Sequence, residues 1–128
     1  MSNLPKQLKY TDTHEWINIK DKEITIGITE HAQGELGDLV FIELPEVGAE
    51  VEAGAEIGVL ESVKAASDFY TPVTGVISAV NDDAAANPAV VNTDPYNDGW
   101  LVKVAITNPE ELEKMLTFTQ YEGLISKE

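Results

Sequence analysis

The 128-residue sequence contains no cysteine and no arginine. The lack of cysteine excludes a disulfide scaffold, catalysis by a thiolate and metal sites with cysteine ligands. No apolar run approaches the roughly 18 residues that predict a membrane-spanning helix. The first six residues have neither the apolar core of a signal peptide nor the arginine-rich character of a transit peptide, so we expect a cytoplasmic protein.

Positive charge is also scarce, because 8 basic residues face 23 acidic ones and the net charge is −15. Such a charge repels nucleic acids and anionic membranes, so we expect neither as a partner. It favours partners with basic docking faces, although a generally acidic proteome would produce the same balance. The length predicts a single domain over residues 1–128, and we expect it to act as a monomer.

Short runs of apolar residues indicate a mostly β protein. Residues 15–19 and 24–29 have strand periodicity, with Ile24, Ile26 and Ile28 on one face, and residues 20–23 form a hairpin turn between them. Further strands are expected near residues 39–44, 57–60, 69–71, 76–80 and 100–106. This spacing is typical of an all-β sandwich or barrel with helices as minor additions.

The expected helices are short. Thr29 is placed to N-cap one turn that ends at Gly34, and an Ala-rich piece follows Asn81. The clearest start is Asn108-Pro109, with acids in the first turn and Leu112, Met115 and Leu116 as the inward face. We expect a last short helical segment at residues 120–125.

Lys64 is the only lysine or arginine between Glu23 and Val102, a stretch of 80 residues with 15 acids. A Schiff-base lysine must be deprotonated near neutral pH, but Glu61 and Asp68 favour its charged form. A lysine that another enzyme modifies needs only exposure, and the small residues after Lys64 leave room for a visiting active site. An ordinary surface lysine remains the alternative.

Other catalytic chemistry has little support in the sequence. His14 and His31 lack the spacing of a zinc-binding helix, and no nucleophile–histidine–acid arrangement can be inferred. There is no glycine-rich phosphate loop, and Asp94 and Asp98 do not follow the calcium-loop pattern. We therefore expect no catalytic residue and no bound metal.

The motif Glu61-Ser62-Val63-Lys64-Ala65 resembles the modified turn of the H-protein family of the glycine cleavage system, whose members are lipoyl carriers. Four other blocks resemble the same family in the same order, at residues 14–16, 27–33, 37–45 and 91–100. The likeness extends over nearly the whole chain, from Leu8 to Ile125. A lone Ser-Val-Lys-Ala would be a weak signal, whereas five ordered blocks are a strong one.

The resemblance implies a hybrid barrel-sandwich fold, similar to lipoyl and biotinyl domains, with short helices and a C-terminal helix. It also implies that Lys64 lies on a hairpin turn and carries covalently attached lipoate. The chain would be a non-catalytic carrier of glycine catabolism in the bacterial cytoplasm. It would take an aminomethyl group from the glycine decarboxylase (P protein) to the aminomethyltransferase (T protein). It would present its dihydrolipoyl group to dihydrolipoyl dehydrogenase (L protein), and a lipoate ligase or octanoyltransferase would modify Lys64.

The family also implies a surface cleft into which the loaded arm folds, so that water does not reach the aminomethyl group. The matching residues are Thr13, Glu15 and Asp68, and a carboxylate there would pair with the protonated amine. Thr13 stands where the family often has serine. Threonine keeps the hydroxyl group and adds a methyl group. His31 either lines the same cleft or belongs to a short structural helix.

Four other interpretations stay open. A lipoyl domain of a 2-oxoacid dehydrogenase typically has Asp-Lys-Ala at its modified turn, whereas Val63 precedes the lysine here. Biotin carriers favour methionines beside the lysine, and the two methionines of this sequence are Met1 and Met115. An unmodified module that binds a basic partner, and a carrier that passes lipoate to other complexes, also fit the sequence.

Overall fold

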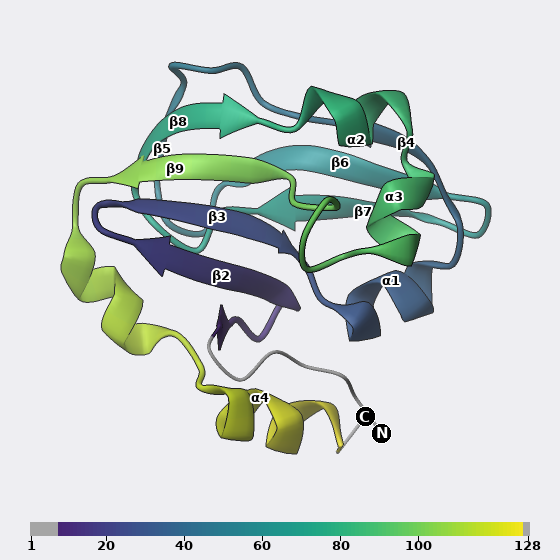
Figure 1. The fold of residues 1–128 in the computed structure, drawn as a ribbon. Helices are drawn as coiled ribbons and strands as arrows, with labels where there is room; N and C mark the ends of the chain where they lie inside the picture. The colour runs from purple at the N-terminus through teal and green to yellow at the C-terminus, as the bar shows by residue number, and fades with distance from the viewer. Residues whose placement is uncertain (1–7, 127–128) are drawn as a thin grey trace.

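The computed structural model describes residues 8–126, in which short strands form two antiparallel sheets with helices around them (Figure 1). The larger sheet contains, in spatial order, β1 (Lys9–Tyr10), β2 (Glu15–Lys20), β3 (Glu23–Ile28), β9 (Val102–Ile106), β8 (Gly75–Val80) and β5 (Glu50–Val51). The smaller sheet contains β4 (Leu39–Glu43), β6 (Glu56–Ser62) and β7 (Ala66–Tyr70). In the described part of the chain, neither sheet closes into a barrel.

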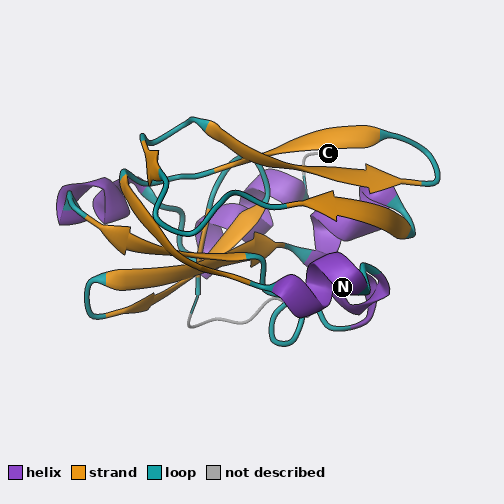
Figure 2. Cartoon of the chain, turned by 90° about the horizontal axis from the view of Figure 1, so that it is seen from above, coloured by secondary structure: helices purple, strands orange, loops and turns teal. Residues whose placement is uncertain are grey.

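The main hydrophobic core lies between the two sheets, which form separate layers when seen from above (Figure 2). Ile24, Ile26 and Ile28 are all buried in this core, as their alternation predicted. They meet Leu60 and Phe69 of the smaller sheet in the same cluster. The β2–β3 hairpin is also confirmed, with Lys20 paired to Glu23 and Asp21 in a left-handed turn conformation at φ 58°.

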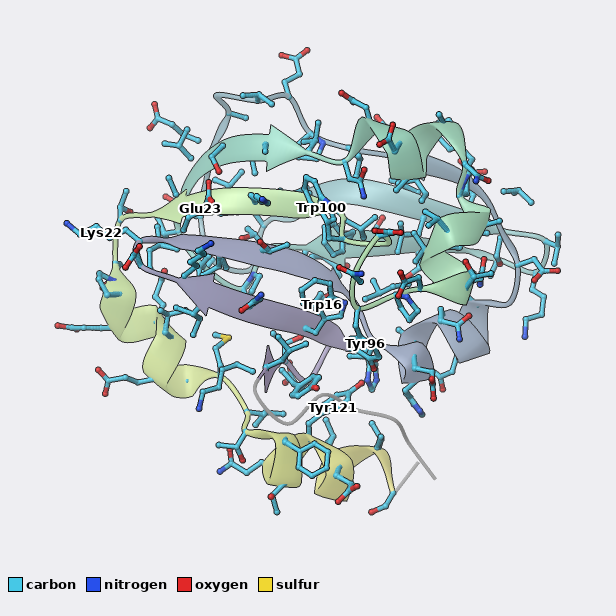
Figure 3. All side chains as sticks on the ribbon, in the orientation of Figure 1. Trp16, Lys22, Glu23, Tyr96, Trp100 and Tyr121 are labelled. Atoms are coloured by element: carbon cyan, nitrogen blue, oxygen red, sulfur yellow. The ribbon has the colours of Figure 1, made fainter. Side chains whose placement is uncertain are left out.

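A second, aromatic cluster joins the C-terminal helix α4 (Phe118–Ile125) to the edge strand β1. Tyr10, Trp16 and Tyr121 are buried there, and the rings of Tyr10 and Tyr121 stack with centroids 4.8 Å apart. Figure 3 labels Trp16 and Tyr121 in this cluster. Thr117 caps α4 through a reciprocal capping box with Gln120, so the helix begins at Phe118, two residues before the predicted start. The prediction of a mostly β fold with short helices and a C-terminal helix is confirmed.

The segment after Asn108 differs from the prediction. Pro109–Lys114 forms a 3-10 helix, η1, rather than an α-helix, and the Asn108 side chain makes no capping hydrogen bond. The helix ends because Leu116 forms a backbone bridge with Tyr10, with N–O distances of 2.8 and 2.7 Å. Leu112 and Met115 therefore pack on the main core, whereas Leu116 packs on the aromatic cluster.

The first helix is longer than the sequence predicted. Helix α1 (Glu30–Leu36) continues through Gly34 and ends at Gly37, whose φ of 81° is left-handed. Thr29 caps its start by accepting a hydrogen bond from the Ala32 N–H, as expected. Helices α2 (Asp82–Ala86) and α3 (Ala89–Thr93) lie at the same end of the sheets (Figure 1).

Two sequence expectations involve residues outside the described part of the chain. The predicted single domain over residues 1–128 includes residues 1–7 and 127–128, which lie outside the described part. The expectation that the N-terminus carries no targeting signal also concerns residues 1–7. Among residues 8–126, no helix is long and apolar enough to cross a membrane.

Candidate functional site

Lys64 lies at the tip of the hairpin that joins β6 to β7, and its side chain is exposed. The backbone N–H of Ser62 donates to the Ala65 carbonyl at 2.8 Å, and the side chain of Ser62 adds further hydrogen bonds across this turn. Its Oγ accepts hydrogen bonds from the backbone N–H groups of Lys64 and Ala65, at 3.1 and 3.0 Å, and donates to the Ala65 carbonyl at 3.1 Å. The serine hydroxyl therefore satisfies backbone groups of the turn and restricts the conformation of the backbone at Lys64.

The hairpin tip rests on the connection between α1 and β4. The Val63 N–H donates to the Asp38 carbonyl at 3.1 Å, which ties the tip to the rest of the fold. A Cβ on Gly37 would lie 3.2 Å from Cε of Lys64, and the left-handed φ of Gly37 disfavours any other residue. Glycine at position 37 thus ends α1 and also leaves space for the lysine stem.

Glu15 is a buried carboxyl group in the tight loop that begins β2. It is 3% exposed, and its Oε1 accepts hydrogen bonds from the hydroxyls of Thr11 and Thr13 at 2.6 and 2.5 Å. Burial raises the pKa of Glu15 from its ordinary value of 4.5 to about 7, and the two threonine hydrogen bonds oppose part of that rise. Near neutral pH, Glu15 is therefore poised between its neutral and charged forms.

Thr13, Glu15 and Asp68 line one small cleft of about 140 Å³. Asp68 is exposed at β7 and accepts a hydrogen bond from the Tyr70 hydroxyl at 3.3 Å. The negative charge of Asp68 is the main reason that the pKa of Tyr70 is raised, so this phenol stays a proton donor. Three residues from two distant segments thus place two carboxyl groups and a hydroxyl around one space.

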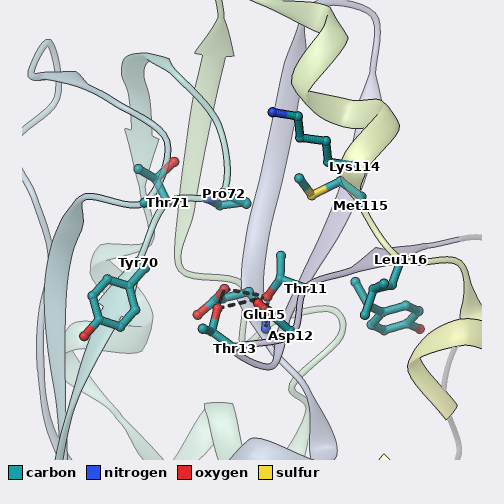
Figure 4. A pocket seen from close by; sticks show the side chains of 12 residues that line it. Thr11, Asp12, Thr13, Glu15, Tyr70, Thr71, Pro72, Lys114, Met115 and Leu116 are labelled. Carbon is teal, nitrogen blue, oxygen red and sulfur yellow. Dashed lines mark hydrogen bonds between the residues drawn. The ribbon is translucent and has the colours of Figure 1, made fainter. Parts of the chain in front are cut away.

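A second, larger cavity of about 470 Å³ shares part of this wall. Figure 4 shows Glu15 between Thr11 and Thr13, with Tyr70 on one side of the cavity and residues 114–116 on the other. Glu15 and Thr13 line both spaces. The buried carboxyl group therefore forms part of the wall between the two cavities.

His31 is not among the residues that line the 140 Å³ cleft, whereas His14 is. The two rings lie side by side, with centroids 4.8 Å apart. His14 was not a candidate in the sequence because its partner Tyr121 is 107 residues away, and no local spacing connects them. Thr11 was missed for another reason: a threonine becomes informative only when its hydroxyl is known to meet a buried acid.

A two-sheet β domain that presents one exposed lysine at a hairpin tip, beside a small acidic cleft, belongs structurally with carrier domains of the lipoyl and biotinyl type. Comparison with known proteins gives the family. The model of the family "Glycine cleavage H-protein" matches residues 8–128. The chain belongs to this family.

Individual relatives agree with the family match. A glycine cleavage system H protein of Legionella pneumophila (strain Corby) is 56% identical over 121 residues, covering 94% of this chain and 97% of the relative. One of Chromohalobacter salexigens is 54% identical, covering 100% and 98%. The crystal structure of a glycine cleavage system H protein from Mycobacterium marinum superposes with a TM-score of 0.86 at 41% identity, covering 96% of this chain and 99% of that one.

Proposed function

We propose that this chain is the lipoyl carrier of a glycine cleavage system, with lipoate joined by an amide bond to Nζ of Lys64. The position of Lys64 carries the proposal, because its side chain is exposed at the tip of the β6–β7 hairpin and small residues follow it. A lipoate ligase or octanoyltransferase needs access to this amine and no catalytic group from the chain. The carrier itself is non-catalytic.

The residues around Lys64 fit an attached arm. Amide formation removes the positive charge of the amine and releases the activating group of the acyl donor. The attached group would supply a disulfide, and a dithiol when reduced, on a long flexible stem. Ser62 holds the base of that stem in a defined turn, and tethering keeps the arm at a high effective concentration wherever the chain docks.

Thr13, Glu15 and Asp68 fit a cleft for the aminomethyl-loaded arm. A protonated amine that enters this cleft would find Asp68 at an exposed position and Glu15 in the buried wall. Its positive charge would lower the pKa of Glu15 from about 7 and favour the carboxylate, which then pairs with it. Glu15 would thus be largely neutral in acid when the cleft is empty and charged when an amine is bound.

The partners follow from the carrier role. The chain would receive the aminomethyl group at the glycine decarboxylase, release it at the aminomethyltransferase and be reoxidised at dihydrolipoyl dehydrogenase, in the bacterial cytoplasm. The net charge of −15 favours docking faces that are rich in lysine and arginine. Partner binding should therefore weaken as salt concentration rises.

Intact-mass measurement tests the attachment site. The wild type, Lys64→Arg and Lys22→Arg are each incubated with lipoate, ATP and a lipoate ligase. Lys22 is a matched control, because it is also exposed at the tip of a β-hairpin, between β2 and β3. We expect one lipoyl-sized increment in the wild type and in Lys22→Arg, and none in Lys64→Arg.

Two results would contradict the proposal. Equal modification of Lys64→Arg would show that another amine is the acceptor. No modification of any of the three proteins, with a known lipoyl domain modified in parallel, would favour an unmodified interaction module instead.

A further inference from the structure

Two imidazoles and a carboxylate lie together beside the cleft, although their spacing in the sequence does not predict a metal site. His14 and His31, which are all the histidines of the sequence, have ring centroids 4.8 Å apart. Glu35 lies one turn after His31 on α1, with its Oε2 3.6 Å from Nε2 of His31. One ligand atom from each of the three residues lies within 4.8 Å of the others. We propose that His14, His31 and Glu35 form a site for one divalent metal ion of the zinc class.

The ligand atoms of the three residues lie up to 4.8 Å apart, somewhat wider than around a bound zinc ion. Histidine nitrogen and carboxylate oxygen bind zinc at about 2.0–2.2 Å, so neighbouring ligand atoms of a tetrahedral site lie roughly 3.3 Å apart. The pair formed by His31 and Glu35 already has nearly this separation. The side chain of Glu35 is 58% exposed and that of His31 24% exposed. Small rotations of these two side chains would bring all three ligand atoms onto one ion.

His14 is held in place in the way that ligating histidines usually are. Its Nδ1 lies 2.8 Å from the hydroxyl of Tyr121, which is fully buried and lies 2.7 Å from Oγ1 of Thr29. Metal-bound histidines commonly use their second nitrogen in such a hydrogen bond, which fixes the ring orientation. The Tyr121 hydroxyl thus holds the ring of His14 in the cluster that it forms with His31 and Glu35.

The donor set defines the class of metal. Two imidazoles with one carboxylate suit transition metals such as zinc, nickel, copper or iron(II), whereas calcium and magnesium prefer oxygen ligands alone. Because the chain has 23 acidic and 8 basic residues, its negative potential raises the local concentration of any cation. Three protein ligands leave a coordination position open, and His14 and Glu35 both line the 140 Å³ cleft. The open position would therefore face this cleft.

Zinc titration of the unmodified chain, prepared without a histidine tag, tests this site without any use of the lipoyl group. Calorimetry gives the stoichiometry and the dissociation constant, and NMR follows the ring signals of the two histidines. We expect one ion per chain, and both imidazoles should shift together. His31→Gln and Glu35→Gln should each weaken binding by about tenfold or more, and Tyr121→Phe by about tenfold, in line with the loss of a supporting hydrogen bond.

The control is Glu30→Gln, which removes a carboxylate from the same helix but outside the cluster. It should leave the dissociation constant within twofold of the wild type, and circular dichroism should show that every variant is folded. Equal weakening by Glu30→Gln and Glu35→Gln would overturn the site, because the ion would then be held by general acidity. Absence of saturable zinc binding to the folded wild type would overturn it directly. In that case the two rings only pack together.

Discussion

The hairpin tip that presents Lys64 and the loop that presents Glu15 are built in opposite ways. The tip is exposed, contains small residues and is held by the hydroxyl of Ser62 together with a backbone hydrogen bond from Ser62 to Ala65. The loop from Thr11 to Glu15 buries a carboxyl group, and it holds His14 at a left-handed φ of 70°. An attachment point needs access and little else, whereas a cleft that binds a charged group must keep polar atoms in place away from water.

The largest effect is expected from the buried carboxyl group. Because the folded pKa of Glu15 is about 7 and its ordinary value is 4.5, the folded state holds the proton more tightly than the unfolded state. The stability associated with protonated Glu15 is fully present below about pH 4.5 and is lost as pH rises through about 7. This loss amounts to about 3 kcal/mol at most.

Glu15→Gln removes that titration and keeps an oxygen that accepts hydrogen bonds from the two threonines. Denaturant unfolding across this pH range should therefore show the variant gaining stability relative to the wild type as pH rises. Glu52→Gln, at an exposed acid, should show a constant difference from the wild type. A constant difference for Glu15→Gln as well would mean that the pKa of Glu15 is the same in the folded and unfolded states.

A smaller effect is expected at the exposed side of the cleft. Asp68→Asn keeps the shape of the side chain but removes the charge that would pair with a protonated amine. The half-life of the aminomethyl-loaded protein, followed by release of its ammonia, should fall about threefold to tenfold, corresponding to roughly 1 kcal/mol for an exposed charge-assisted contact. Glu61→Gln is the control, because Glu61 belongs to the same hairpin but does not line the cleft. Equal half-lives for Asp68→Asn and the wild type would show that Asp68 does not hold the amine of the loaded arm.

The smallest effect is expected at the turn itself. Ser62→Ala removes the hydroxyl that closes the tip, so the lysine should sample more orientations while the fold stays intact. The unfolding free energy should fall by about 0.5–1 kcal/mol, and the initial rate of lipoylation should fall a few-fold. Ser67→Ala, in the exposed strand after the turn, should change neither quantity measurably. Similar rates for Ser62→Ala and the wild type would show that the ligase shapes the turn itself.

The contrast between the local hairpin tip and the long-range cleft also explains which features could be predicted from the sequence. Lys64 stands out because exposure and charge isolation are properties of a local stretch, and the β2–β3 hairpin has an equally local signal. The end of α1 was placed at Gly34 rather than Gly37, because glycine is tolerated within a helix and the left-handed turn is taken at the later residue. The segment after Asn108 had good helix signals, yet the bridge between Tyr10 and Leu116 ends it early.

The cleft could not be predicted from local patterns. Thr13, Glu15 and Asp68 were named through the family resemblance, because nothing in their spacing shows that β2 and β7 meet at one cleft. The pair of His14 and His31 was missed for the same reason. Only the fold brings the first loop against α1, and Tyr121 of the C-terminal helix then holds the ring of His14. Long-range packing creates the site, whereas the attachment point is encoded in a short stretch of sequence.

The most direct test of the carrier role is the exchange of bicarbonate with the carboxyl carbon of glycine, catalysed by purified glycine decarboxylase. The lipoylated chain is added as the only carrier and compared with the unmodified chain and with Lys64→Arg. We expect exchange that rises with the concentration of the lipoylated chain and stays at background with the other two. Background exchange with the fully lipoylated chain, while a known H protein supports exchange in the same assay, would contradict the carrier role and favour passage of lipoate to other complexes.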